Sequence, residues 1–178
     1  ERLTIPQSIQ RRTLMQLKDI KKIAVIGAGT MGSGIGQLAA MAGYETVLYD
    51  LNDEATGRAK ASIEKNLDGA LSRGKITEED KQNALSRLTF TTDFADLKAD
   101  VLVEAILEKL DIKQDLFTKL AEQNADNAIL ATNTSSIPIT RIARPIANPG
   151  RVVGMHFFNP AHIMKLVEVV SGASTDPA

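Results

Sequence analysis

Short apolar runs alternate along the chain with longer segments in which apolar residues recur every three or four positions. A short apolar run bounded by polar residues predicts a strand, and a period near 3.6 residues predicts a helix with one buried face. The pattern predicts strands at residues 22–26, 46–50, 88–91, 101–104, 129–132, 152–158 and 165–170. It predicts helices at residues 30–42, 53–71, 78–86 and 110–123. Strands that alternate with helices are typical of a mostly parallel sheet, so we expect an α/β fold.

The two helices predicted after the second strand are together longer than an ordinary crossover connection. Apolar residues recur every four positions from Ala55 to Leu71, which predicts a helix with a single apolar face. Thr77 precedes three acidic residues and is typical of a helix start, because its hydroxyl can cap the first turn. We therefore expect a helical arm that stands off the sheet and meets a ligand; a second layer of packing is the alternative.

The first strand leads into a glycine-rich turn, and the second strand ends on an acid. The candidate cofactor-binding residues are Gly27, Ala28, Gly29, Thr30, Met31, Gly32 and Asp50. Gly27 permits a tight turn, Gly29 leaves room for a pyrophosphate, and Gly32 lets the helix pack closely on the strand. The first N–H groups of the helix can bind the phosphates, because they have no partner within the helix. Asp50 can accept hydrogen bonds from the ribose hydroxyls and would repel a 2′-phosphate. This order predicts a Rossmann-type, doubly wound sheet that binds NAD rather than NADP; glycines that serve only helix packing are the alternative.

A second polar group follows the later strands. Ser135 comes after the run at 129–132, at a strand end where open α/β sheets bind ligands. We expect Ser136 to cap the next helix and to leave Ser135 free. His156 and Glu168 each lie in an apolar run, and a carboxylate buried there must be paired. If the two runs are neighbouring strands, Glu168 accepts from one ring nitrogen of His156 and leaves the other to take a substrate proton. A structural histidine is the alternative, and His162 receives no role.

The composition excludes several kinds of chemistry. The chain has 178 residues, no cysteine and a formal net charge of −1. The lack of cysteine excludes disulfides, thiolate catalysis and cysteine metal sites, and we expect no metal site of another kind. A charge near zero gives no reason to expect a nucleic-acid partner. No apolar run approaches the length of a membrane span.

The length suits one domain, and the pattern divides the chain into three parts. We expect an N-terminal extension or linker at residues 1–20, the dinucleotide-binding domain at 21–171, and a polar boundary at 172–178. Residues 1–20 lack the apolar core of a secretion signal. We expect a cytoplasmic protein of bacterial type; a mitochondrial matrix location, suggested by Arg11, Arg12 and Lys18, is the alternative.

Five motifs together resemble the NAD-binding domain of L-3-hydroxyacyl-CoA dehydrogenases, of the 3-hydroxybutyryl-CoA dehydrogenase type. They lie at residues 27–34, 103–108, 133–136, 156–160 and 164–168. The resemblance implies that NAD accepts hydride from C3 of a 3-hydroxyacyl-CoA and yields the 3-ketoacyl-CoA. The corresponding pathways are fatty-acid β-oxidation or the reverse, butyrate-type route.

The resemblance also implies a role for individual residues. His156 would be the general base on the 3-hydroxyl, Glu168 would orient it, and Ser135 would bind the substrate oxygen beside the nicotinamide. Further residues implied at the cofactor site are Glu108, Lys113, Ser135 and Asn159, and those implied at coenzyme A are Asn66 and Arg73.

The resembled family continues into a C-terminal helical domain that supplies dimer contacts. The resemblance therefore implies that residues 172–178 lead to such a domain, and that the intact protein is a homodimer or part of a multifunctional β-oxidation protein. The 178-residue piece is expected to bind NAD better than it catalyses. Two alternatives stay open: a non-catalytic NAD-binding module, and a related dehydrogenase that acts on a free hydroxy acid.

Overall fold

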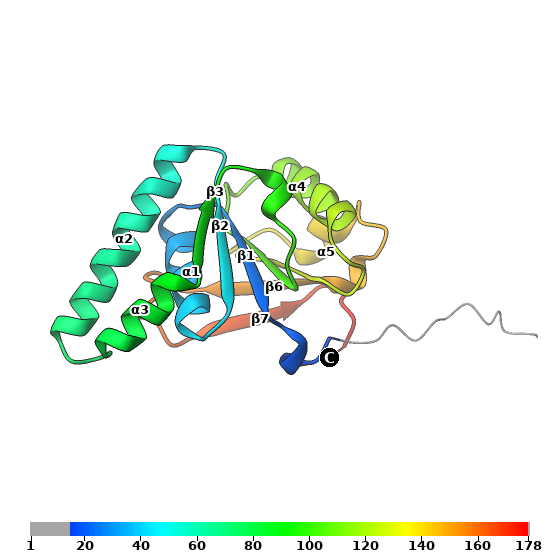
Figure 1. The fold of residues 1–178 in the computed structure, drawn as a ribbon. Helices are drawn as coiled ribbons and strands as arrows, with labels where there is room; N and C mark the ends of the chain where they lie inside the picture. Colours follow the sequence, from blue (N-terminus) through cyan, green and yellow to red (C-terminus); the bar gives the residue numbers. More distant parts are fainter. Residues whose placement is uncertain (1–14, 178) are drawn as a thin grey trace, which may run out of the picture.

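A seven-stranded sheet forms the centre of the structure and has helices on both faces (Figure 1). The computed structural model describes residues 15–177. The strands are β1 (Lys22–Ile26), β2 (Glu45–Tyr49), β3 (Leu88–Thr91), β4 (Val101–Glu104), β5 (Ile129–Thr132), β6 (Val152–Phe157) and β7 (Val167–Ser171). They lie in the order β3-β2-β1-β4-β5-β6-β7; β1 to β6 are parallel, and β7 pairs antiparallel with β6. The predicted doubly wound, mostly parallel α/β sheet is confirmed.

The chain changes direction across the sheet between β1 and β4. Strands β1, β2 and β3 follow one another to one edge, and β4, β5 and β6 then run from the other side of β1 towards the opposite edge. In such sheets, ligands bind outside the carboxyl ends of the strands at this reversal. Here those ends are Ile26 and Glu104, which are register partners.

Helices cover the two faces in separate groups (Figure 1). An apolar core lies under each group. The helices are α1 (Thr30–Met41), α2 (Asp53–Ser72) and α3 (Glu78–Ser86) on one face, and α4 (Leu110–Gln123) and α5 (Ile139–Ala143) on the other. Short 3₁₀ turns lie at Leu17–Asp19, Phe94–Asp96 and Pro149–Arg151. Neighbouring residues Val25 and Ile26 enter different cores, because strand side chains alternate between faces. Among residues 15–177, no helix is long and apolar enough to cross a membrane.

The predicted helical arm consists of α2 and α3, and it packs against α1. Ile63 and Leu67 of α2 are fully buried in the core on this face. Asn66 Nδ2 donates a hydrogen bond to Gln37 Oε1 of α1 at 3.1 Å. The inner side of the arm is therefore a second layer of packing, which was the alternative to an arm that stands off the sheet. The far end of α2, around Arg73, is exposed, and so is the start of α3 at residues 77–80.

The two ends of the chain bear differently on the predicted domain limits. Of the predicted extension, residues 1–14 lie outside the described residues. The predicted boundary segment folds back onto the domain, since Thr175 Oγ1 donates to the Val152 carbonyl at 2.7 Å and Asp176 N donates to the Gly150 carbonyl at 2.8 Å. The domain limits stay predictions.

Candidate active site

The glycine turn between β1 and α1 has the geometry that a dinucleotide needs. Gly27 has a φ of +104°, a conformation that side chains disfavour, and a Cβ there would lie 2.6 Å from the Ala105 carbonyl oxygen. A Cβ at Gly32 would lie 1.7 Å from the Gly27 carbonyl oxygen, so the first turn of α1 can approach the strand only without a side chain. Gly29 has nothing within 4 Å of its Cβ position. The turn is therefore closed on its inner side and open where a pyrophosphate would lie.

Asp50 follows β2 and lies directly beside this turn. Its Oδ2 accepts a hydrogen bond from Ala28 N at 2.8 Å, and its Oδ1 accepts one from Asn52 N at 3.1 Å. A carboxylate has about four acceptor positions, so about two remain for other donors. The vicinal hydroxyls of an adenosine ribose match this remaining capacity. The glycine turn and Asp50 together fit NAD.

The structure brings His156, Glu168 and Ser135 together in a hydrogen-bonded line. His156 of β6 and Glu168 of β7 are register partners, and His156 Nδ1 lies 3.0 Å from Glu168 Oε2. On the other side of the ring, Nε2 lies 3.1 Å from Ser135 Oγ. With Glu168 ionised, it accepts from Nδ1–H, so Nε2 carries the lone pair and the Ser135 hydroxyl donates to it. The expected burial of Glu168 is wrong: its side chain is 53% exposed, because β7 is the edge strand of the sheet.

The loop after β5 holds Ser135 in place through contacts to the end of β6 and to the loop that follows β4. Asn133 Oδ1 accepts from Phe157 N of β6 at 2.8 Å. Glu108 Oε1 accepts from Ser135 N at 3.1 Å and Ser136 N at 3.2 Å, and also from the hydroxyls of Thr134 and Ser136. The prediction that Ser136 caps the following helix is wrong, because its hydroxyl is used by Glu108. The residue at the cap of α5 is Pro138.

Glu108 stays ionised in this position. Partial burial raises its pKa, but the Thr134 hydroxyl, the charge and hydrogen bond of Lys113 and the Ser136 amide together lower it to about 2. Several donors converge on the charged form and favour it over the neutral form. The carboxylate of Glu108 is therefore a permanent acceptor at neutral pH.

Lys113 of α4 is buried between two carboxylates, one of which the sequence analysis missed. Its side chain is 1% exposed, with Nζ 2.5 Å from Glu104 Oε1 and 3.2 Å from Glu108 Oε2. Glu104, at the end of β4, is 0% exposed and also accepts from Thr132 Oγ1 at 2.6 Å and Ile106 N at 2.7 Å. An acid that ends a fully apolar strand was the signal available in the sequence.

The remaining predicted residues lie around this centre or on the arm. Asn159 follows β6, is exposed and precedes Pro160 through a cis peptide bond. The side chain of Asn66 is hydrogen-bonded to Gln37, as described above, and so contributes to the packing of α2 on α1. Arg73 caps the C-terminus of α2 and is exposed. A contact of Asn66 or Arg73 with coenzyme A stays a prediction.

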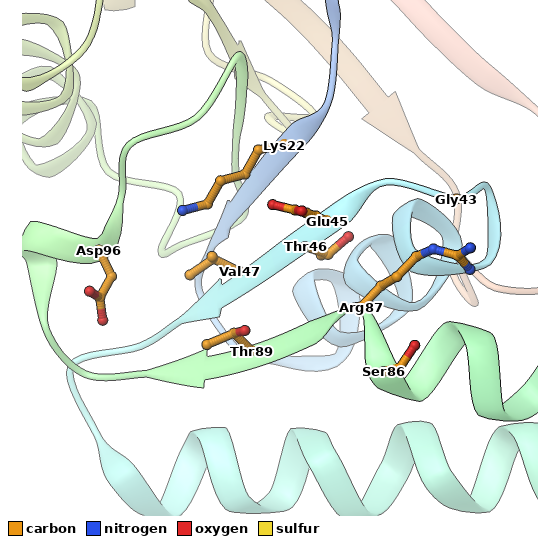
Figure 2. A pocket seen from close by; sticks show the side chains of 9 residues that line it. All are labelled: Lys22, Gly43, Glu45, Thr46, Val47, Ser86, Arg87, Thr89 and Asp96. Carbon is orange, nitrogen blue, oxygen red and sulfur yellow. The ribbon is translucent and has the colours of Figure 1, made fainter.

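A hollow of about 530 Å³ lies elsewhere, over the strands at the β3 edge (Figure 2). Lys22 and Glu45 are register partners, as are Val47 and Thr89, so these side chains project from one face of β1, β2 and β3. The hollow contains no histidine and no residue of the glycine turn. Its lining does not supply the chemistry found at the strand ends, and the candidate active site is therefore the site around His156.

Comparison with known proteins agrees with this geometry. The family model for the 3-hydroxyacyl-CoA dehydrogenase NAD binding domain matches residues 22–178. The chain is 49% identical over 158 residues to the 3-hydroxyadipyl-CoA dehydrogenase of Escherichia coli K12, and this match covers 88% of this chain and 33% of that protein. It is 39% identical over 168 residues to the peroxisomal fatty acid beta-oxidation multifunctional protein of Oryza sativa subsp. japonica, and this match covers 93% of this chain and 23% of that protein.

A solved structure shares the fold as well as the sequence. The crystal structure of 3-hydroxybutyryl-CoA dehydrogenase from Escherichia coli K12 matches with a TM-score of 0.86 and 50% identity, covering 88% of this chain and 33% of that one. The chain thus spans a third or less of the length of these relatives. The matched range contains the glycine turn, Ser135, His156 and Glu168. The chain therefore belongs to the 3-hydroxyacyl-CoA dehydrogenase family and corresponds to its NAD-binding domain.

Proposed function

We propose that the polypeptide that carries this chain oxidises an L-3-hydroxyacyl-CoA to the 3-ketoacyl-CoA with NAD. The observation that carries the proposal is the line Ser135–His156–Glu168 at the carboxyl ends of β5 and β6. It lies on the side of the sheet where the glycine turn leaves β1. A module that only binds a nucleotide has no use for a histidine held between a hydroxyl and a carboxylate.

His156 is the general base of the proposed reaction. The substrate 3-hydroxyl takes the place of the Ser135 hydroxyl on Nε2, breaks its O–H bond and gives its proton to this nitrogen as the C3 carbonyl forms. When NAD is bound, its nicotinamide ring supplies the acceptor for the hydride that leaves C3. Glu168 keeps Nδ1 protonated and stabilises the positive imidazolium that results. Ser135 stays within hydrogen-bond reach and donates to the substrate oxygen.

Other residues hold the two ligands. The glycine turn and the first N–H groups of α1 bind the pyrophosphate, and Asp50 binds the adenosine ribose. The exposed edge of Glu108 and the Asn159 amide line the nicotinamide side. Arg73, exposed at the far end of the arm, can bind a phosphate of coenzyme A through its guanidinium.

The acyl group and the cellular setting are also part of the proposal. The relatives are named for hydroxyadipyl and hydroxybutyryl substrates, so we propose a short-chain 3-hydroxyacyl-CoA. We propose a homodimer in the cytoplasm of a bacterium, since relatives come from Escherichia coli, with membership of a multifunctional protein as the alternative, as in the rice relative. Light scattering of the full-length polypeptide measures the assembly.

The test is the exchange of each histidine in the full-length polypeptide. The sequence has two, so His162→Gln is a matched control for His156→Gln. Loss of the general base is expected to lower kcat with acetoacetyl-CoA and NADH by a factor of about 100 or more, while NADH affinity stays within about twofold. The His162→Gln variant is expected to keep the kcat of the wild type. Equal turnover of the wild type and His156→Gln would disprove the assignment of the base.

Turnover and NADH binding of the wild-type polypeptide separate the two alternative functions, a non-catalytic NAD-binding module and a dehydrogenase of free hydroxy acids. A non-catalytic module would bind NADH by calorimetry and show no turnover with any acyl-CoA. A dehydrogenase of free hydroxy acids would turn over 3-hydroxybutyrate as fast as its CoA thioester. Either result would replace the proposed function.

A further inference from the structure

A continuous chain of polar contacts links the buried end of β4 to the imidazole of His156. Glu104 Oε1 contacts Lys113 Nζ at 2.5 Å, and the same nitrogen contacts Glu108 Oε2 at 3.2 Å. The other oxygen of Glu108 accepts from Ser135 N at 3.1 Å, and Ser135 Oγ lies 3.1 Å from His156 Nε2. Glu104 also accepts from Thr132 Oγ1 and Ile106 N, but the line of contacts from its side chain to His156 runs through Lys113, Glu108 and Ser135.

The first two side chains of this line of contacts are buried, and the third is partly exposed. Glu104 is 0% exposed, Lys113 is 1% exposed and Glu108 is 39% exposed at its side chain. Buried charges are costly unless they are paired, and removal of one partner leaves the other uncompensated. Lys113 therefore cannot leave Glu104, whose oxygens are also held by Thr132 and Ile106 N. The ammonium is a fixed point from which Glu108 is positioned.

The two oxygens of Glu108 have different tasks. Lys113 holds Oε2, which leaves Oε1 as the acceptor for the donors of residues 134–136. Among the described residues, Glu108 is the side chain that accepts from Ser135 N. The backbone of Ser135 is thus held by the carboxylate of Glu108, beside the contact of Asn133 with Phe157 N, and not by regular secondary structure.

We infer that the buried Glu104–Lys113 ion pair, acting through Glu108, holds the Ser135 hydroxyl against Nε2 of His156, which makes Glu104 a positioning residue for the reaction. The inference rests on the proposed function for its kinetic part. Glu104 lies too deep to touch substrate or coenzyme, so its effect on the reaction passes through Ser135. A purely structural ion pair would contribute to folding and would act independently of Ser135.

The kinetic test is a double-mutant cycle in the full-length polypeptide with Glu104→Gln and Ser135→Ala. Glutamine keeps the size of the side chain and an acceptor for Thr132, but it removes the charge that fixes Lys113. We expect Glu104→Gln to lower kcat by about 10- to 100-fold, because a small displacement of a positioned group has effects of this size, with KM for NADH within about threefold. In the Ser135→Ala background, Glu104→Gln is expected to change kcat by less than about twofold. If the two substitutions lowered kcat independently, so that their fold-changes multiplied in the double variant, the inference would be overturned.

A matched control is available on the arm. Lys81 and Asp68 form another ion pair, at 2.6 Å, far along the chain from the site residues. Lys81→Met removes this pair and is expected to leave kcat within about twofold of the wild type in both backgrounds. If Glu104→Gln does not fold, Glu108→Gln serves in its place, since it leaves the Glu104–Lys113 pair intact. The same non-additivity with Ser135→Ala is expected, and additive effects would again overturn the inference.

A second measurement does not depend on turnover. The amides of Ser135 and Ser136 donate to Glu108, so their hydrogen exchange reports the position of this loop. We expect exchange at both amides to be at least about 10-fold faster in Glu104→Gln and unchanged in Lys81→Met. Exchange that is unchanged in Glu104→Gln would refute the inference. Faster exchange in a protein without any 3-hydroxyacyl-CoA turnover would refute the proposed function alone.

Discussion

Asp50 offers the sharpest test of cofactor choice, because the structure shows how its carboxylate is used. Two of about four acceptor positions are taken by Ala28 N and Asn52 N, which leaves about two for the ribose hydroxyls. Hydrogen bonds to a charged group contribute about 1.5–3 kcal/mol each. Two bonds at the lower end of this range predict that Asp50→Ala loses about 3 kcal/mol, or roughly 150-fold, in NADH affinity. NADPH affinity should rise, because the 2′-phosphate no longer meets a carboxylate.

Asp50→Asn separates ribose binding from support of the glycine turn. Asparagine keeps an oxygen that can accept from Ala28 N, so the turn should hold, while the loss of charge should weaken NADH binding by about 10-fold. Asp53→Asn makes the same change of charge three residues further on, at the exposed start of α2, and should change affinity by less than twofold. Calorimetric titration of the full-length polypeptide with NADH and NADPH measures all three variants. If Asp50→Ala kept both affinities within twofold, the ribose contact would be refuted.

Two further predictions concern stability. Gly34→Ala would place a methyl group 2.9 Å from Ala161 Cβ and is expected to lower the free energy of unfolding by about 1–3 kcal/mol. Gly57 also lies in a helix but has open space at its Cβ position, so Gly57→Ala should raise the free energy of unfolding by up to about 1 kcal/mol. Urea unfolding that ranks the two variants the other way would contradict the packing described. The pKa of Glu108 is lowered from 4.5 to about 2, so its ionised form stabilises the fold above pH 4.5 and this contribution is lost as pH falls towards 2. Since the side chain is 39% exposed, we expect the free energy of unfolding of the wild type to exceed that of Glu108→Gln by only about 1 kcal/mol at neutral pH. If urea unfolding at pH 2 gave the same difference between the two proteins, the result would count against the ion pair.

Much of the fold was predictable because its signals are local. Strands β1, β3, β4 and β5 and helix α4 begin and end at the predicted residues. For β1, β4 and β5 the reason is that buried parallel strands are short apolar runs, and for α4 it is a clear helical period. Strand β7 begins two residues later than predicted. It is an exposed edge strand, and its apolar residues do not report burial, so its start could not be read from hydrophobicity.

The site was predictable only in part for the same reason. The pairing of His156 with Glu168 followed from two runs that could be neighbouring strands, and the antiparallel register places the two residues opposite each other. The engagement of Asn66 by Gln37 could not be seen, because it depends on how α2 crosses α1. The expected cap at Ser136 failed because a carboxylate 28 residues earlier in the chain competes for its hydroxyl.

The sequence by itself determined the glycine turn, its acid and the alternation of strands and helices. These features depend on contacts within one strand–turn–helix unit, where the backbone conformation follows from the residues present. The tertiary structure alone decided that Glu104, Lys113 and Glu108 converge on the loop of Ser135, because these residues come from different elements. Their contacts exist only once β4 lies beside β5 and α4 packs on the sheet, and the order of strands in a sheet is set by the packing of the whole domain.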